Sequence, residues 1–548
     1  MIVLLAPAEW TPAPARPSLA AFRDPRIGQS LRDWLYNDVP MPQSVTKVLV
    51  ANRGEIAVRI IRACREMQLR TVAVYSECDR TALHVRYADE AYAIGANAPR
   101  ESYLRIDKLL DVARQSGADA VHPGYGFLAE NAGFARACRD AGLTFIGPTP
   151  EAIDLMGSKT AARAEAMAAG VPVVPGTKDP LGPDVADAEV ARIAGEVGYP
   201  VLIKAVAGGG GKGMRTVTQA ADLPGSLRAA RSEALSSFGD PAIYVERRII
   251  RPRHIEIQLL GDHHGTVVPF VERECSIQRR HQKVVEESPS SVVTPELRRR
   301  MAGAAAAVAR RVGYSNAGTI EFLLDESGEF FFLEMNTRLQ VEHPITELVT
   351  STDLVHWQIR IARGERLDLD PERMLAPVGH AIECRIYAED PDRDFLPSPG
   401  LVTALRAPAG PGIRRDDGGA VAGVVVPVFY DPLIAKLATW AETRPMAIAR
   451  MARALDEYDV RGIKTTIPFF RWLLADPDFL AGRIDTTFID HALAARNGRP
   501  FLEVPEDAEH IAAVAVALQA FARKAPTAPG PAASDSRWQR AARTEALR

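Results

Sequence analysis

Polar and apolar residues alternate along the segment EMNTRLQVE, residues 334–342. Successive side chains of an extended strand point to opposite faces, so the pattern predicts a strand with one polar and one apolar wall. The polar wall carries Glu334, Asn336, Arg338, Gln340 and Glu342. The segment follows an aromatic, core-like run, FFFL. A solvated strand face seldom has this composition, and we therefore expect the wall to bind something both metallic and anionic.

Strand-like and helix-like patterns alternate between residues 47 and 156. The strand-like run KVLVA precedes a glycine-containing turn, the helical pattern EIAVRIIRACREM and a second strand-like run, RTVAVYS. Another strand-like run, AVHPG, follows a further helix. Such alternation is typical of an open, mostly parallel sheet covered by helices. We therefore expect an α/β protein, with α+β character in its later part.

The pattern and the length divide the chain into several regions, because 548 residues are too many for one hydrophobic core. We expect an irregular, Pro-rich extension over 1–43, an open α/β domain over 44–156, a second domain over 157–375 with a smaller unit at about 174–248, a third domain over 376–492, and a helix with a disordered tail over 493–548. The tail helix is predicted at 506–523. Met41, just before the first clear strand, offers an alternative start of translation.

Composition narrows the choice of partners and compartment. The net charge of -3 at pH 7 gives no reason to expect nucleic acid or an anionic membrane as a partner. The five cysteines form no CxxC pair, which favours a reducing compartment over a disulfide frame or a zinc site. No apolar run approaches the ~20 residues of a membrane-spanning helix. The opening MIVLLAPA is short and has no preceding basic residue, so we interpret it as neither signal peptide nor anchor. We expect a cytoplasmic protein.

A run of four glycines, Gly208 to Gly211, follows a strand-like segment that carries Lys204. Glycines let backbone N–H groups approach phosphate oxygens and let a loop move. The run is not a Walker A loop, because Lys212 is followed by Gly213 instead of Ser or Thr. The pattern favours a phosphate-covering lid over a flexible surface hairpin.

Two β-rich runs, GTIEFLLD and EFFFLEMN, meet at Ser327-Gly328, a pair suited to a tight turn. If that pair is a two-residue loop, Glu321 lies directly opposite Glu334. Like charges in that position destabilise a ladder, and Mg²⁺ or Mn²⁺ shared with substrate phosphates would neutralise them. In the alternative, the turn has three residues and the two glutamates are offset and solvated.

Four further motifs are ambiguous taken singly. The cation-rich run RECSIQRRHQKVVEES, residues 273–288, is either a solvated, mutually paired charge run or a functional segment. The segment HIEIQ, residues 254–258, predicts a half-buried strand with a polar face. HPGYGFLAEN, residues 122–131, is a glycine-containing turn from strand to helix. In ECRIYAEDP, residues 383–391, Arg385 is either an anion contact or an ordinary strand cation.

Together with ANRGEIA (51–57), LMGSK ending at Lys159, and FLPSPG (395–400), these motifs resemble the biotin carboxylase family of ATP-grasp enzymes. The resemblance covers about residues 45–490, and the order of so many motifs makes it specific. It implies a Rossmann-like first domain, an ATP-grasp domain with a mobile lid, and a small mixed C-terminal domain.

The resemblance also implies roles for matching residues. The residues that would contact the nucleotide are Lys159, Lys204, Gly210, Gly211, Glu246, Arg247, Ile249, His254, Gln278 and His281. Two Mg²⁺ or Mn²⁺ ions would be bound by Glu321, Glu334 and Asn336. Bicarbonate would be bound by Lys283, Arg338, Gln340, Val341 and Glu342, and biotin by Arg385 and Tyr125.

The chemistry that the resemblance implies begins at Glu342, which takes the proton of bicarbonate. The bicarbonate then attacks the γ-phosphate of ATP and gives carboxyphosphate, whose charge metal and cations offset. Carboxyphosphate yields CO₂ and phosphate, and the phosphate deprotonates the ureido nitrogen of biotin. Arg385, with Arg338, stabilises the biotin enolate.

Some positions depart from the family pattern. Ala207 and Arg247 stand where the family commonly has glycine and lysine, and both changes are mild. Tyr387 and the run GDHHG look closer to the α subunits of acyl-CoA carboxylases. The AMKM-type lysine motif of their biotinyl domain is absent. We therefore expect biotin on a separate carrier protein, with carboxyltransferase subunits as further partners.

The oligomeric state rests on a few matching positions. Arg59, Arg62 and Arg414 match positions near the dimer contact of the family, which implies a homodimer. Pro411 replaces an aromatic residue that is sometimes found there, which leaves the oligomeric state open.

Three functional hypotheses remain open from the sequence. The first is the biotin carboxylase subunit of an acetyl-CoA or acyl-CoA carboxylase, which serves fatty acid biosynthesis. The second is the same chemistry in a two-subunit pyruvate carboxylase. The third is a catalytically silent nucleotide-binding subunit, and the crowding of so many charged site residues argues against it.

Overall fold

The computed structural model describes residues 44–177, 179–206, 214–502, 506–524 and 544–545. The expected extension over 1–43, most of the expected tail, and the lid glycines Gly210 and Gly211 lie outside the described residues. The chain divides into two units, residues 1–496 and 497–548, and each is described by itself.

A five-stranded parallel sheet opens the first unit, in the order β3-β2-β1-β4-β5. Its strands are β1 (Lys47–Val50), β2 (Arg70–Ser76), β3 (Glu90–Gly95), β4 (Ala120–His122) and β5 (Thr144–Phe145). The helices beside it are α2 (Gly54–Glu66), α3 (Leu83–Tyr87), α4 (Ile106–Ser116), α5 (Ala132–Asp140) and α6 (Pro150–Gly157). Adjacent residues Leu49 and Val50 are both fully buried, as expected for a strand covered on two faces. The predicted open α/β sheet is confirmed.

A small antiparallel sheet, β7-β6-β8, follows α7 (Lys159–Ala168). Its strands are β6 (Val201–Ala205), β7 (Met214–Val217) and β8 (Ile243–Arg247), and α8 (Asp187–Val197) and α9 (Leu223–Phe238) pack on it. Val201 and Ile203 are buried beneath the helices, whereas Lys204 is only partly buried. The alternation along β6 therefore separates the core of this sheet from its polar face.

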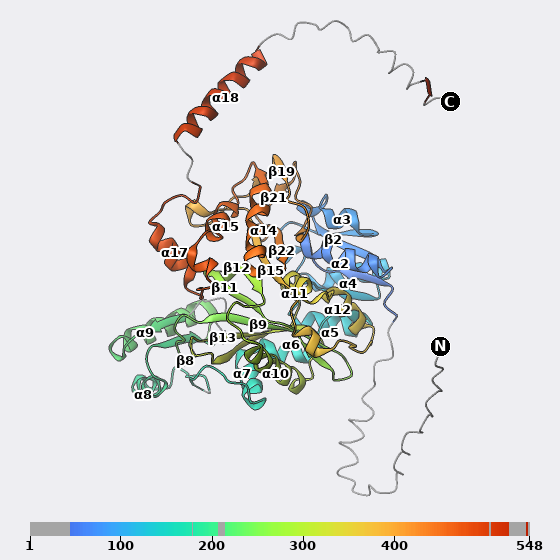
Figure 1. Ribbon diagram of the computed structural model, residues 1–548. Coiled ribbons are helices and arrows are strands. Elements are labelled where there is room, and N and C mark those ends of the chain that lie inside the picture. The colour runs from blue at the N-terminus through green and yellow to red at the C-terminus, as the bar shows by residue number, and fades with distance from the viewer. Residues whose placement is uncertain (1–43, 178, 207–213, 503–505, 525–543, 546–548) are drawn as a thin grey trace, which may run out of the picture. The chain divides into compact units, whose positions relative to one another are not determined.

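The largest sheet has nine strands in the order β14-β13-β9-β11-β12-β15-β22-β20, with β10 paired to β9. Its strands are β9 (Arg253–Gly261), β10 (Val267–Pro269), β11 (Arg273–Arg279), β12 (Gln282–Ser288), β13 (Asn316–Leu324), β14 (Phe330–Asn336), β15 (His380–Tyr387), β20 (Ile413–Asp417) and β22 (Leu433–Ala441). β12 and β15 are direct neighbours (Figure 1). One continuous sheet therefore crosses the boundary expected at residue 375.

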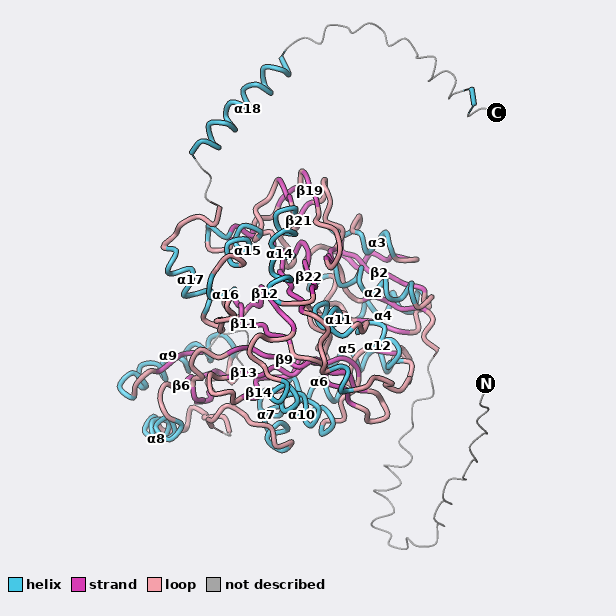
Figure 2. Tube along the Cα trace, in the orientation of Figure 1, coloured by secondary structure: helices cyan, strands magenta, loops and turns pink. Residues whose placement is uncertain are grey.

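Helices and short strands complete the first unit (Figure 2). The helices are α10 (Pro295–Arg311), α11 (His343–Thr350), α12 (Leu354–Ala362), α13 (Pro371–Met374), α14 (Arg444–Glu457), α15 (Ile467–Leu473), α16 (Pro477–Leu480) and α17 (Phe488–Arg496). The short strand pairs are β16 (Glu389–Asp390) with β17 (Leu396–Pro397), β18 (Gly400–Leu401) with β21 (Val425–Val426), and β19 (Ala404–Arg406) with β23 (Asp459–Arg461). α7 and α10 bury apolar side chains against β9, β13 and β14.

The strand predicted over residues 334–342 is too long. β14 ends at Asn336, the chain then bends, and α11 begins at His343 with Pro344 in its first turn. Proline is favoured there because its missing N–H needs no partner in the first turn of a helix. The Thr337 N–H donates to the Glu130 carboxylate, 3.0 Å away, and not to a neighbouring strand.

The hairpin of β13 and β14 pairs Glu321 with Glu334, as predicted. The predicted two-residue loop is wrong, because residues 326–328 form a three-residue turn between Asp325 and Glu329. The Asp325 carboxylate accepts hydrogen bonds from the backbone N–H groups of Ser327 and Glu329, which stabilises this turn. An irregularity after Glu321 shifts the register by one residue and returns the two glutamates to opposite positions.

The second unit contains α18 (Glu506–Lys524), which matches the helix predicted at 506–523. Among the described residues, no helix combines the length and apolar character needed to cross a membrane.

Candidate active site

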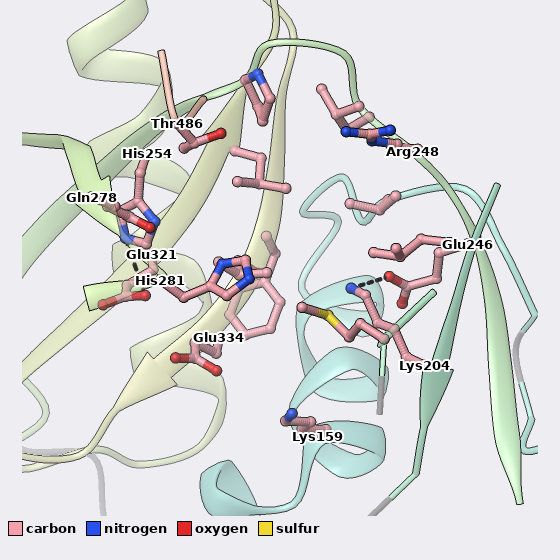
Figure 3. A pocket seen from close by; sticks show the side chains of 18 of the residues that line it. Lys159, Lys204, Glu246, Arg248, His254, Gln278, His281, Glu321, Glu334 and Thr486 are labelled. Atoms are coloured by element: carbon pink, nitrogen blue, oxygen red, sulfur yellow. Dashed lines mark hydrogen bonds and ion pairs between the residues drawn. The ribbon is translucent and has the colours of Figure 1, made fainter. Parts of the chain in front are cut away.

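A cavity of about 790 Å³ lies between the small sheet and the β9–β14 part of the large sheet. Figure 3 shows Lys204 and Glu246 on one side of it and His254, Glu321 and Glu334 on the other. The predicted residues that line it are Lys159, Lys204, Glu246, Arg247, Ile249, His254, Gln278, His281, Lys283, Glu321, Glu334, Asn336, Arg338, Gln340, Val341 and Arg385. The fold thus brings together residues that span more than 200 positions of the chain.

One side of the cavity carries the cations of the small sheet and of α7. The Lys204 Nζ lies 2.5 Å from Glu246 Oε2, and the Arg163 guanidinium lies 3.2 Å from Glu246 Oε1. Lys159 opens α7 directly after its N-cap, Ser158, and its side chain lines the same cavity (Figure 3). Several cations around one carboxylate suit a polyphosphate group, which can attract them when it binds.

Glu321 is the most heavily contacted carboxylate of the opposite side. Its Oε1 accepts hydrogen bonds from Lys283, Asn336 and Gln340 at 2.7, 2.9 and 3.2 Å. Its Oε2 lies 3.1 Å from His254 Nε2. Burial opposes its charge, but Lys283 and His254 outweigh burial and hold the pKa of Glu321 well below its usual range.

Glu334 faces Glu321 across the ladder and is exposed to the cavity. The surrounding protein desolvates Glu334 and so raises its pKa, and the negative charge of Glu321 adds to this rise. Asn336 adds an amide on the same side, one pleat further on. Two opposed carboxylates and an amide oxygen are ligands that suit a hard divalent cation, so this donor set fits Mg²⁺ or Mn²⁺.

Lys283 lies at the centre of the charged cluster. Its Nζ contacts Glu256 Oε2 at 2.5 Å, Glu321 Oε1 at 2.7 Å and Glu342 Oε1 at 2.8 Å. Burial disfavours an ammonium ion, but the three carboxylates raise the pKa of Lys283 well above its usual value. This residue therefore remains a cation at neutral pH and joins strands β9 and β13 to the start of α11.

Glu342 occupies the N-cap position of α11 and is fully buried. Lys283 holds one of its carboxylate oxygens, and the Arg385 guanidinium donates to the other at 2.9 Å. Burial alone would raise its pKa, yet these cations keep the pKa of Glu342 well below the usual value. Glu342 is therefore an ionised carboxylate clamped between two cations, although its own side chain does not line the cavity wall.

Arg338 follows the end of β14 and is held by three side chains. It donates to Glu130 Oε2 at 2.9 Å, to Gln340 Oε1 at 2.7 Å and to Asn336 Oδ1 at 3.1 Å. Glu130 comes from the HPGYGFLAEN segment of the first domain. The first domain thus orients a cation that lines the cavity.

Tyr125, predicted beside biotin, does not line the cavity. Its ring lies 5.7 Å from the Lys436 ammonium, whose Nζ also donates to the Val341 carbonyl at 3.0 Å. Lys436 is itself fully buried against Glu55. Lys436 therefore connects the Tyr125 ring to the backbone carbonyl of Val341.

Sequence reasoning missed four charged residues of this site: Glu130, Glu256, Arg273 and Lys436. Arg273 is fully buried and donates to Glu256, to Gln258 at 3.0 Å and to Thr346 at 2.8 Å. Glu256 lay in a segment noted for its polar face and Arg273 lay in the cation-rich run, but the local pattern gave no reason to choose either residue. The solvated alternative for residues 273–288 is wrong, because β11 and β12 are largely buried.

Comparison with protein-family models divides the chain into three matches. The model "Biotin carboxylase, N-terminal domain" matches residues 44–153. The model "Carbamoyl-phosphate synthase L chain, ATP binding domain" matches residues 158–370, and "Biotin carboxylase C-terminal domain" matches residues 383–491. The three matches follow the order expected for the fold.

Curated relatives and solved structures cover the same part of the chain. A pyruvate carboxylase subunit from Methanothermobacter thermautotrophicus is 51% identical over 467 residues, which are 85% of this chain and 94% of that protein. Biotin carboxylase of Halalkalibacterium halodurans is 50% identical over 453 residues, which are 83% of this chain and 99% of that protein.

A solved structure is similar at the level of the backbone. The biotin carboxylase domain dimer of 2-oxoglutarate carboxylase from Hydrogenobacter thermophilus, in complex with MgADP, ADP and bicarbonate, has a TM-score of 0.78 and 47% identity, and covers 84% of this chain and 100% of that chain. Together with the three domain matches and the charged cavity, these likenesses show that the chain belongs to the biotin carboxylase family.

Proposed function

We propose that this protein is a biotin carboxylase, which uses ATP and bicarbonate to carboxylate the ureido nitrogen of biotin. The observation that carries the proposal is Glu342, whose carboxylate Lys283 and Arg385 hold from two sides. A base that must meet an anionic substrate needs cations that hold both. Lys283 and Arg385 also line the cavity, so they can serve the base and the substrate together.

The proposed roles follow the resemblance to the family, and the lining of the cavity supports them for most of the described residues. Nucleotide is bound by Lys159, Lys204, Gly210, Gly211, Glu246, Arg247, Ile249, His254, Gln278 and His281. Glu321, Glu334 and Asn336 would hold two Mg²⁺ or Mn²⁺ ions, which when bound supply positive charge to the nucleotide phosphates. Bicarbonate is held by Lys283, Arg338, Gln340, Glu342 and the backbone of Val341. Biotin is held by Arg385 and, more distantly, by Tyr125.

In the proposed reaction, Glu342 accepts the bicarbonate proton while Lys283 and Arg338 keep the substrate beside it. A bicarbonate oxygen attacks the γ-phosphorus of ATP, and the bond from that phosphorus to ADP breaks. The resulting carboxyphosphate yields CO₂ and phosphate, and the phosphate removes the ureido proton of biotin. Arg385 and Arg338 stabilise the enolate, which attacks CO₂.

The activity is tested by ADP release from ATP and bicarbonate, with and without free biotin. We expect biotin to increase the rate, and a folded sample without biotin-dependent ADP release would refute the enzyme and favour the silent nucleotide-binding protein.

The variant Arg338→Ala tests the proposed bicarbonate site. It is expected to bind nucleotide normally but to lose turnover by about 10²-fold or more, because a charge that meets the transition state is removed. Arg406→Ala, at an exposed position of β19, is the matched control and should keep both properties. Normal turnover of Arg338→Ala would contradict the role.

The acceptor of the carboxyl group remains a choice between two contexts. The relative from Methanothermobacter thermautotrophicus, which is named as part of a pyruvate carboxylase, favours that enzyme, whereas Tyr387 and the GDHHG run favour an acyl-CoA carboxylase. Assays with a biotinylated carrier and each type of carboxyltransferase would separate oxaloacetate from malonyl-CoA or another acyl-CoA product.

We also propose a homodimer and the domain limits 44–156, 157–375 and 376–492. We further propose a cytoplasmic location, which the five free cysteines support.

A further inference from the structure

Beside Arg385, on the same face of the large sheet, two buried glutamates face each other. Glu286 on β12 and Glu383 on β15 are paired directly in the antiparallel ladder. Side chains in that relation have Cβ atoms about 4.5–5.5 Å apart and lie on the same face. Both residues are fully buried. Like charges so placed and so far from water would destabilise the sheet strongly.

The hydrogen bonds of the two carboxyl groups are incomplete. Glu286 Oε1 accepts from Arg385 Nε at 2.7 Å and lies 2.5 Å from Arg385 Nη2. Glu286 Oε2 is buried without a hydrogen-bond donor among the described residues. Both oxygens of Glu383 are likewise buried without a hydrogen-bond donor among the described residues. Three buried oxygens on two opposed carboxyl groups therefore lack a donor, and a proton on one group would engage two of the three in a hydrogen bond.

No neighbouring cation is free to neutralise Glu383 within the described structure. The charged groups that face it are Lys436 on β22, Glu286 on β12, Arg385 on its own strand, and Glu342 at the start of α11. Lys436 is committed to Glu55 at 3.1 Å and to the Val341 carbonyl at 3.0 Å. Arg385 is committed to Glu286 and Glu342.

We propose that Glu286 and Glu383 share one proton and that Glu383, acting through Glu286, is a positioning residue for Arg385. The inference rests on the proposed function in one respect only, the role of Arg385 toward biotin. A carboxyl proton on Glu383 donates to Glu286 Oε2 and leaves Glu286 Oε1 for the guanidinium. The pair then carries one negative charge, so Arg385 keeps positive charge for the developing biotin enolate while its orientation stays fixed.

Electrostatics agree with a single proton in the pair. Burial raises the pKa of Glu286 to about 7, although Arg385 and Lys283 oppose this and Glu342 adds to it. Burial also raises the pKa of Glu383 well above its usual value, although Lys436 and Arg385 oppose this rise and Glu286 and Glu342 add to it. At alkaline pH the loss of the proton would place a second negative charge beside Arg385. The attraction between Arg385 and an anionic biotin enolate should then weaken.

The shared proton is tested directly by infrared difference spectra of the full-length protein at neutral pH. The wild type should show a protonated-carboxyl band that Glu383→Gln removes. Glu272→Gln is the matched control, because Glu272 is equally buried but is bound by Arg298 at 2.6 and 2.8 Å and should not carry the proton. An unchanged band in Glu383→Gln would overturn the shared proton whether or not the protein is an enzyme.

The positioning role is tested by kinetics. Glu383→Leu should lower kcat/KM for biotin by about tenfold, the size expected when a hydrogen bond to a charged group is disturbed. The slow, biotin-independent release of ADP should fall by a smaller factor, because Lys283 still holds the other oxygen of Glu342. Glu383→Gln, whose amide can donate to Glu286, should recover most of the loss and abolish the alkaline decline in kcat/KM for biotin.

The outcomes separate the two proposals. Loss of the infrared band with an unaltered biotin dependence in Glu383→Leu would refute the positioning role. A wild type without biotin-dependent ADP release would refute the proposed function, while the infrared result would still decide whether the proton is shared.

Discussion

Lys283 shows how one side chain can organise a site. Its ammonium group contacts three carboxylates, from Glu256, Glu321 and Glu342, and all three are buried. Buried charges are costly to leave unpaired, and removal of one partner leaves the others without compensation. The same cation that is proposed to hold bicarbonate therefore also favours the charged form of Glu321 and Glu342.

The variant Lys283→Met tests this dependence. We expect it to lower the free energy of unfolding by about 3–5 kcal/mol, the range for breaking a buried ion pair, and to remove turnover. Lys464→Met, at an exposed position, is the control and should change stability by less than about 0.5 kcal/mol. Chemical denaturation measures both, and an unchanged unfolding free energy for Lys283→Met would contradict the structural role.

The buried carboxyl group of Glu55 predicts that the free energy of unfolding depends on pH. Burial raises its pKa from 4.5 to about 7, although Lys436 opposes this. Its native state holds a proton more tightly than its unfolded state, so its stabilising contribution is complete below about pH 4.5 and is lost as the pH rises through about 7. The variant Glu55→Gln should remove about 3 kcal/mol of this dependence. Denaturation at several pH values measures it, and parallel curves for wild type and variant would contradict it.

At the scale of elements, periodicity identified the faces of strands better than their ends. Alternation correctly assigned Glu334, Asn336, Arg338 and Gln340 to one cavity wall, whereas Glu342, predicted beside them, is buried and does not line the wall. It could not show that β14 ends at Asn336, because the Thr337 N–H bonds to Glu130, about 200 residues earlier in the chain. A local pattern contains no information about such a partner.

The cation-rich run was ambiguous for the same physical reason. Whether Arg273 is solvated or buried depends on Glu256 and Gln258 of β9 and on Thr346 of α11, which surround its guanidinium. The parallel α/β character of the first sheet needed only local periodicity. The pairing of Glu321 with Glu334 was predicted from a two-residue loop, and it holds because the register shift after Glu321 offsets the three-residue turn. The site around Lys283 needed strands that meet only in the folded sheet, and the resemblance to a family supplied what the pattern could not.

Two glycine substitutions test how closely β9 and its neighbours pack. A Cβ at Gly261, the last residue of β9, would lie 2.3 Å from the Tyr314 carbonyl oxygen, so Gly261→Ala should destabilise the protein by about 1–3 kcal/mol. Gly303 lies within α10, where a Cβ meets nothing within 4 Å. Gly303→Ala should therefore stabilise by about 0.5–1 kcal/mol. Thermal unfolding measures both signs, and equal shifts would contradict the packing argument.

For the molecule as a whole, the central feature is the sheet that passes from the nucleotide-binding region to the C-terminal region. Residues Val285 to Ser288 of β12 pair with Ala381 to Cys384 of β15. Across this same junction, Arg385 joins Glu286 and Glu342. The sequence regions 157–375 and 376–492 are therefore joined by backbone hydrogen bonds and by the charges of the site.

This junction predicts one cooperative unfolding transition for residues 44–496. Chains cut after residue 375 should fail to fold separately, because β12 and β15 would each lose a neighbour and expose an unpaired strand edge. Mixing the two fragments should restore part of the biotin-dependent turnover. Calorimetry of the intact chain and of each fragment checks this, and independent transitions in the fragments would contradict it.

The continuous sheet also bears on how members of such a family can exchange parts. A recombination point placed at residue 375 would follow the boundary between sequence regions, yet it would pair a β12 from one parent with a β15 from another. The foreign strand would bring its own partner for Glu286, together with its own arginine and its own register. Functional hybrids should therefore inherit β12 and β15 from the same parent, and natural gene fusions should break the chain outside this strand pair.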